Sequence, residues 1–118
     1  MAFIKLNGEQ YELKFSYLSL LAIEKHYKKG VFKVFSETDL NNLETLTAFV
    51  WACLRKEKKF KNKDVDDIAV LIDDAIENED ITLESLAQAI EEAFNDSVIL
   101  KNAIEKGKQE GGKEEGKA

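Results

Sequence analysis

The feature that most constrains the fold is a continuous apolar segment near the middle of the chain, DLNNLETLTAFVWACLRK at residues 39–56. At 100° per residue, a helix here aligns large apolar side chains in one tight stripe, with further apolar residues on both sides of it. A helix that is apolar around more than half of its circumference needs neighbours on several sides. We therefore predict a buried central helix, with Leu43, Leu46, Val50 and Leu54 as its stripe and with Ala48 and Ala52 on its outer face.

The first fifteen residues predict a β-hairpin. Apolar and polar residues alternate on either side of Asn7-Gly8, and these two residue types suit a type I′ turn because both central positions need a positive φ. With a two-residue loop, Leu6 pairs with Glu9. One face of the hairpin is then apolar and is expected to pack on helices, because a lone two-stranded hairpin is marginally stable. Its residues are Ala2, Ile4, Leu6, Tyr11 and Leu13.

Three further segments have helical periodicity, at residues 16–29, 64–78 and 82–105. Ser16 and Thr82 are suited to cap the first and the last of them. Gly30 suits the left-handed position that often follows a helix. In the helix at residues 64–78 we expect an inward face of Val65, Ile68, Ala69, Ile72 and Ile76, supported by Leu71 and Ala75.

Residues 31–35 alternate apolar and polar, and two interpretations stay open, a third short strand or an irregular apolar bridge. The predicted fold class is α+β, mainly α, with an N-terminal hairpin packed on a bundle of about four helices. We expect one domain over residues 1–105. Residues 106–118 contain four glycines and no apolar residue larger than alanine, so we predict a disordered, flexible C-terminal tail.

The last predicted helix offers a candidate contact surface near its end. Its apolar residues recur every seven positions, a repeat that keeps one seam against a partner helix. The helix is longer than the others, so its last turns are expected to project past the core. The candidate contacts with an oligomer or a client protein are Val98, Ile99, Leu100 and Ile104. The alternative, that these residues pack on the first helix of the same domain, stays open.

Charge is distributed unevenly along the chain. Residues 1–63 carry 12 Lys or Arg and 7 Asp or Glu, whereas residues 64–96 carry 12 Asp or Glu and no Lys or Arg. Such polarity can steer a partner or orient copies of the chain. Residues 56–63 (KEKKFKNK) combine lysines with Phe60, but the net charge of −6 makes nucleic-acid binding an unfavoured hypothesis.

Sequence motifs for catalysis, cofactors and metals are absent. Neither Gly8 nor Gly30 belongs to a phosphate-binding pattern, and His26 and Cys53 are each the single residue of their type. We therefore expect a protein that is not an enzyme and that has no cofactor or metal. No apolar run has the roughly 18 residues of a membrane span, and the N-terminus lacks the pattern of a signal peptide. These observations predict a cytoplasmic protein.

The opening IKLNGEQYELKFS at residues 4–16 resembles the start of the small tail assembly chaperones of long-tailed bacteriophages and prophages. In that family a hairpin of the type I-x-L-N-G-x-x-Y-x-L-x-F precedes a helix with a Glu and a Gly, here Glu24 and Gly30. A hydrophobic helix with a central aromatic residue, here Trp51, and then an acidic helix follow. The resemblance covers roughly residues 3–100.

The resemblance implies a non-enzymatic chaperone in the cytoplasm of an infected or lysogenic bacterial host, absent from the mature virion. Its implied partners are the tape measure protein, which it keeps soluble, and the tail-tube protein, which polymerises around the tape measure protein. A homo-oligomer that coats the client is a further expectation. The alternative hypothesis is a small regulatory protein-interaction or nucleic-acid-associated module, with residues 56–63 as its contact loop.

Overall fold

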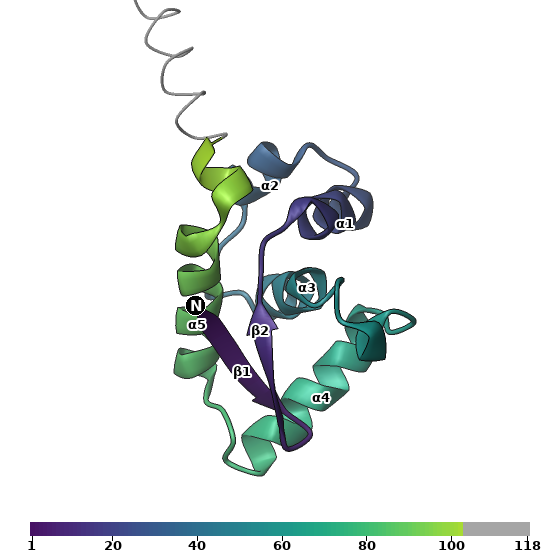
Figure 1. Cartoon of the computed structure of the whole chain (residues 1–118), viewed down its shortest axis with the longest axis vertical. Helices are drawn as coiled ribbons and strands as arrows, with labels where there is room; N and C mark the ends of the chain where they lie inside the picture. Colours follow the sequence, from purple (N-terminus) through teal and green to yellow (C-terminus); the bar gives the residue numbers. More distant parts are fainter. Residues whose placement is uncertain (103–118) are drawn as a thin grey trace, which may run out of the picture.

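The computed structural model describes residues 1–102 and has the predicted class, α+β and mainly α (Figure 1). The N-terminal hairpin lies beside the helices, and α5 runs along it on one side. The domain boundary expected at residue 105 and the tail predicted for residues 106–118 lie outside the described part. The elements in chain order are β1 (Ala2–Leu6), β2 (Glu9–Leu13), α1 (Tyr17–Tyr27), α2 (Val31–Glu37), α3 (Leu43–Cys53), the 3-10 turn η1 (Lys58–Phe60), α4 (Val65–Glu77) and α5 (Leu83–Asp96).

The hairpin has the predicted register, with Leu6 opposite Glu9 and Ala2 opposite Leu13. Asn7 and Gly8 have φ values of 52° and 78°, the positive values that a type I′ turn requires. The predicted apolar face is buried against α5 and α4, which gives the two strands the cover that they need. This pairing is therefore confirmed.

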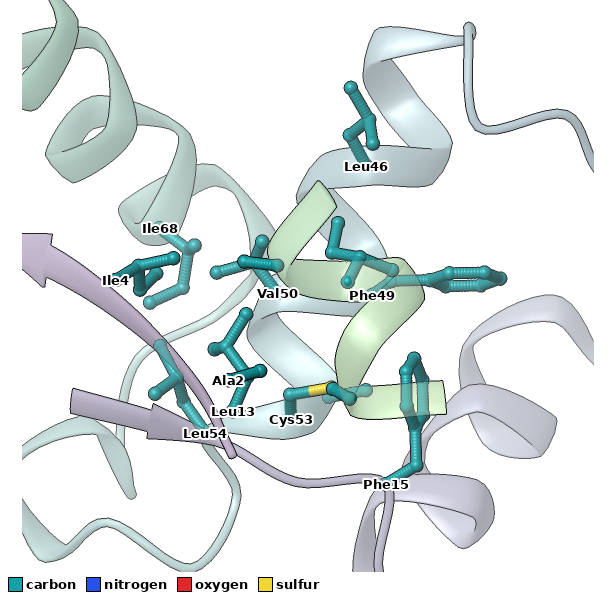
Figure 2. Close-up of a cluster of buried hydrophobic side chains, with 14 of the residues drawn as sticks. Ala2, Ile4, Leu13, Phe15, Leu46, Phe49, Val50, Cys53, Leu54 and Ile68 are labelled. Carbon is teal, nitrogen blue, oxygen red and sulfur yellow. The ribbon is translucent and has the colours of Figure 1, made fainter. Parts of the chain in front are cut away.

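Helix α3 forms the centre of the core, as predicted, and contacts α1, α4 and α5. Figure 2 shows Val50 and Cys53 of α3 pointing into the same cluster as Ile4 and Leu13 of the hairpin and Ile68 of α4. Leu46, Val50 and Leu54 of the predicted stripe are at most 4% exposed. These apolar contacts supply the main driving force for packing the hairpin onto the helices.

Two details of the central helix prediction are wrong. Leu43 is 61% exposed, because the Asn42 side chain caps α3 and makes Leu43 the first helical residue, at the edge of the core. Ala48 and Ala52, predicted on the outer face, are buried because three helices surround α3. Small side chains at these positions leave room for close packing.

Residues 31–37 form the helix α2, so both interpretations of this segment, strand and irregular bridge, are wrong. The Val31 N–H donates to the Glu24 carboxylate (2.9 Å), which satisfies a free donor at the start of the helix. Val31 and Val34 share one buried face. The left-handed residue after α1 is Lys28, with φ 57°, whereas Gly30 has φ −60° and precedes α2.

The capping predictions for the remaining helices hold. Ser16 caps α1, and Thr82 and Asp64 form reciprocal capping boxes at the starts of α5 and α4. On α4, Ile68 and Ile72 are buried as predicted. Ala75, predicted to support this face, is also buried, whereas Ala69 is exposed, contrary to the prediction, because the buried face is centred on Ile68, Ile72 and Ala75.

The last helix is shorter than predicted. Helix α5 ends at Asp96, Ser97 has an extended backbone, and the chain is helical again over residues 98–102. The predicted seven-residue seam is interrupted here. At the N-terminal end of α5, Leu83, which belongs to the same predicted seam, is 51% exposed.

Candidate functional site

The break at Ser97 decides how the predicted contact residues are presented. Val98 is 72% exposed, Ile99 is half-buried and Leu100 is fully buried. Ile104 lies outside the described residues. Of the three predicted residues that the structure describes, Val98 and Ile99 can therefore meet a partner directly, while Leu100 fastens the turn to the core.

Ser97 joins this turn to the hairpin. Its buried hydroxyl donates to the Phe15 carbonyl oxygen (2.6 Å) and accepts from the Leu100 N–H (3.3 Å). Phe15 follows β2, so one serine links segments 82 positions apart in the sequence. The Ser97 carbonyl oxygen also accepts from the Lys101 N–H (3.0 Å), which starts the new helical turn.

An open groove of about 700 Å³ lies between this turn and the segment that leads from β2 into α1. We call it the Val98 groove. Its apolar lining includes Val98, Ile99 and the exposed Met1 and Tyr17. Tyr17 was not among the contact residues predicted from the sequence, although its place in the first turn of the helix, directly after the Ser16 cap, was a signal that it can face solvent.

Charged groups lie along the rim of the Val98 groove. The amino group of Met1 pairs with Asp96 (2.9 Å) and Glu92 (3.5 Å) on α5. The hydrogen bond that this amino group donates to the Asp96 carboxylate, followed by the charge of that carboxylate, raises the pKa of the amino group. Lys14 lies 3.8 Å from Glu12. The groove therefore combines an apolar interior with a polar rim, as protein-binding surfaces do.

Replacing Ser97 by Ala is expected to loosen the turn that carries Val98. The change leaves the buried Phe15 carbonyl without its donor, which costs about 1–3 kcal/mol of the free energy of unfolding. Urea denaturation measures this loss, and amide exchange should show weaker protection at Leu100. Ser36→Ala is the control, because its hydroxyl also donates to a backbone carbonyl (2.9 Å, Lys33) but is exposed. Equal effects of the two changes would contradict the structural role of Ser97.

The basic loop at residues 56–63 is held against the domain through its aromatic residue. Phe60 is 5% exposed, and its ring meets that of Tyr11 edge to face at 4.8 Å. Arg55 donates to the carbonyl oxygens of Phe60 (2.7 Å) and Lys63 (3.2 Å). Phe60 thus anchors the loop, and its ring is not available to stack on a nucleic-acid base.

Ion pairing adds a second tie between this loop and the hairpin. The Lys59 ammonium group hydrogen-bonds to the carboxylate of Glu9, which also accepts from the Tyr11 hydroxyl (2.8 Å). The bond from Lys59 first, and then that from Tyr11, lowers the pKa of Glu9. The interaction is solvent-exposed, so its contribution to stability is small.

Within residues 1–102, no group of three or more His, Cys, Asp or Glu side chains could hold a metal ion. Cys53 is buried, and burial raises the pKa of its thiol well above the ordinary value. A thiol in that state is a poor nucleophile. Cys53 thus acts as a packing residue of the core.

None of the helices in the described part of the chain is both long enough and apolar enough to cross a membrane.

The fold and the Val98 groove define a small, mainly helical domain with an open apolar groove beside the start of β1 and the end of β2. The family model described as "Phage tail assembly chaperone protein, TAC" matches residues 3–108. The chain belongs to this family, and the resemblance seen in its sequence is confirmed. Searches among curated proteins and among solved structures found no match.

Proposed function

We propose that this protein is a non-enzymatic chaperone that binds the tape measure protein of a phage tail. It keeps that protein soluble and promotes polymerisation of the tail-tube protein around it. It acts in the cytoplasm of the bacterial host and leaves before the virion is mature. The family match supports the general role, since the family is one of tail assembly chaperones.

The observation that carries the proposal is the exposed apolar side chain of Val98 beside an open apolar groove in a chain of this family. A tape measure protein exposes long apolar helical stripes, which need a groove or a ring of chaperones to cover them. Val98, Ile99 and Tyr17 offer side chains of matching chemistry. Copies of the chain are expected to line up along the client, and the uneven charge distribution gives them a preferred orientation.

Co-expression with a candidate tape measure protein from the same phage or prophage is the experiment that tests the proposal. We expect a soluble complex that survives pull-down and size exclusion, with light scattering giving the number of chaperone copies. The tape measure protein expressed alone is expected to aggregate. A client that is equally soluble alone, or the absence of any complex together with a chaperone that elutes as a plain monomer, would reject the proposal.

The contribution of Val98 is tested with Val98→Asp in the same assay. A carboxylate in the apolar contact must be desolvated on binding, so we expect at least about a tenfold loss of complex. Val70→Asp is the matched control, because Val70 is 60% exposed on α4 and does not line the Val98 groove. A similar loss in both variants would point to a general charge effect and would exclude a specific contact at Val98.

A further inference from the structure

A second apolar groove runs along α5, separate from the Val98 groove. Two hollows of about 370 and 380 Å³ lie between α5 and the chain from the end of α2 to α3, and they share Leu40 and Glu91. The shared residues place the two hollows end to end along α5, and we call the pair the acidic groove. Its lining on α5 extends from Leu83 to Asn95.

One half of the acidic groove has a rigid aromatic wall. Phe15, Phe35, Phe49 and Phe94 pack edge to face, with ring centroids 5.2–6.0 Å apart. Aromatic clusters of this kind hold their shape, so this half is formed before anything binds. The other half is lined by two leucines at the edge of the core, Leu43 and Leu83, which are 61% and 51% exposed. These leucines offer apolar surface that the domain itself leaves uncovered.

The α5 wall of the groove carries negative charge only. Helix α5 has Glu84 and Glu91 in the lining, and it contains no Lys or Arg. The opposite wall is lined by uncharged residues of the α2–α3 connection and of α3, among them Leu40, Asn41 and Leu43. Neither of the two α5 carboxylates forms an ion pair with another residue in 1–102. A ligand with positive charge along the border that faces α5 would complement them.

The length of the groove suits a short helix. The lining from Leu83 to Asn95 spans twelve residue steps on α5, about 18 Å at 1.5 Å per residue, or roughly three helical turns. Helices α1 and α2 of this chain are poor candidates for such a ligand, because each contains one Lys and no Arg. In addition, α1 buries Leu20 and Ile23 in the core of the domain, and α2 has only seven residues.

We propose that the acidic groove binds an amphipathic helix of about three turns, supplied by a client protein, with one apolar stripe bordered by Lys or Arg. The inference rests on the proposed chaperone function and names the kind of client segment that is recognised. The apolar stripe lies against the phenylalanine wall and the two exposed leucines. The basic border that faces α5 lies against Glu84 and Glu91.

Two synthetic 14-residue peptide probes test the proposal directly. They share one leucine stripe and differ only in its borders, which are Lys in one and Glu in the other. Fluorescence anisotropy with the full chain is expected to show at least about tenfold tighter binding of the Lys peptide, weakened by salt. Equal binding of the two peptides, or binding of neither, would overturn the proposal.

A matched pair of double variants assigns the binding to the groove. Glu84→Gln/Glu91→Lys should weaken binding of the Lys peptide at least about tenfold. Asp73→Asn/Glu77→Lys makes the same charge change on the exposed face of α4 and should alter binding less than about twofold. Circular dichroism checks that both variants fold. Equal losses of peptide binding in the two variants would overturn the assignment. A wild-type dimer that the groove variant converts to monomers would also overturn it, because a second copy of the chain would then fill the groove.

Co-expression of the same variants with the tape measure protein separates the two proposals. In one outcome, the wild-type chain keeps the tape measure protein soluble, and the groove variant changes neither that solubility nor peptide binding. This outcome would reject the groove as a binding site and would leave the proposed chaperone function standing. A wild-type chain that binds the Lys peptide but no tape measure protein would reject the proposed function and leave the groove specificity standing.

Discussion

Val50→Asp is expected to leave this protein without a cooperative unfolding transition. Val50 is 0% exposed at the centre of α3, between the hairpin and α4. No basic group lies in this apolar cluster to pair with a carboxylate. Burying it costs about 5 kcal/mol or more, a large part of the roughly 5–15 kcal/mol that stabilises a domain of this kind.

Thermal unfolding followed by circular dichroism measures this effect, with Val70→Asp as the matched control. Val70 is 60% exposed on α4, so the same substitution should change the free energy of unfolding by about 0.5 kcal/mol or less. A cooperative transition for Val50→Asp near that of the wild type would show that Val50 is not in the core.

Phe60→Ala is expected to be the second most damaging change, although Phe60 lies in a loop. The ring is 5% exposed and packs against Tyr11, so its removal leaves a cavity that costs about 3–5 kcal/mol. Trp51 provides a local probe, because its indole N–H donates to the Lys63 carbonyl oxygen (2.9 Å) in the same loop. We expect lower stability in urea and a shift of Trp51 fluorescence to longer wavelength.

Phe32→Ala is the control for the loop anchor. Phe32 is 53% exposed on α2, so removing its ring should cost about 1 kcal/mol or less and should leave Trp51 fluorescence unchanged. Equal stability losses at the two positions would mean that Phe60 does not anchor the loop. In that case the contact-loop hypothesis for residues 56–63 would regain support.

The hairpin, the helix caps and the central position of α3 could be predicted because each depends on local chemistry. Asn7-Gly8 selects its turn through the φ values that only certain residues adopt easily. Ser16, Asp64 and Thr82 satisfy backbone N–H groups a few residues away. Such signals act within one or two turns, so the sequence pattern contains them.

The helix α2 and the break at Ser97 could not be predicted because their causes lie elsewhere in the chain. Residues 31–35 alternate as a strand would, but the Glu24 carboxylate binds the Val31 N–H and starts a helix. The spacing of Ser97 fits a continuous helical seam, but its hydroxyl donates a hydrogen bond to the Phe15 carbonyl oxygen, and the helix breaks there. In both places a contact made on folding overrides the local pattern.

The candidate sites divide in the same way. Val98 and Ile99 could be proposed as contact residues from the sequence, because an apolar pair near the end of a predicted helix is visible there. The acidic groove was not found, since it joins side chains of α2, α3 and α5 that meet only after packing.

The sequence alone thus determined the hairpin, the caps, the apolar stripe of α3 and membership of the chaperone family, because these depend on residue type and short spacing. The tertiary structure decided where α5 stops, which apolar residues stay exposed and where the grooves lie. Exposure depends on which neighbours cover a residue, and those neighbours come from distant parts of the chain.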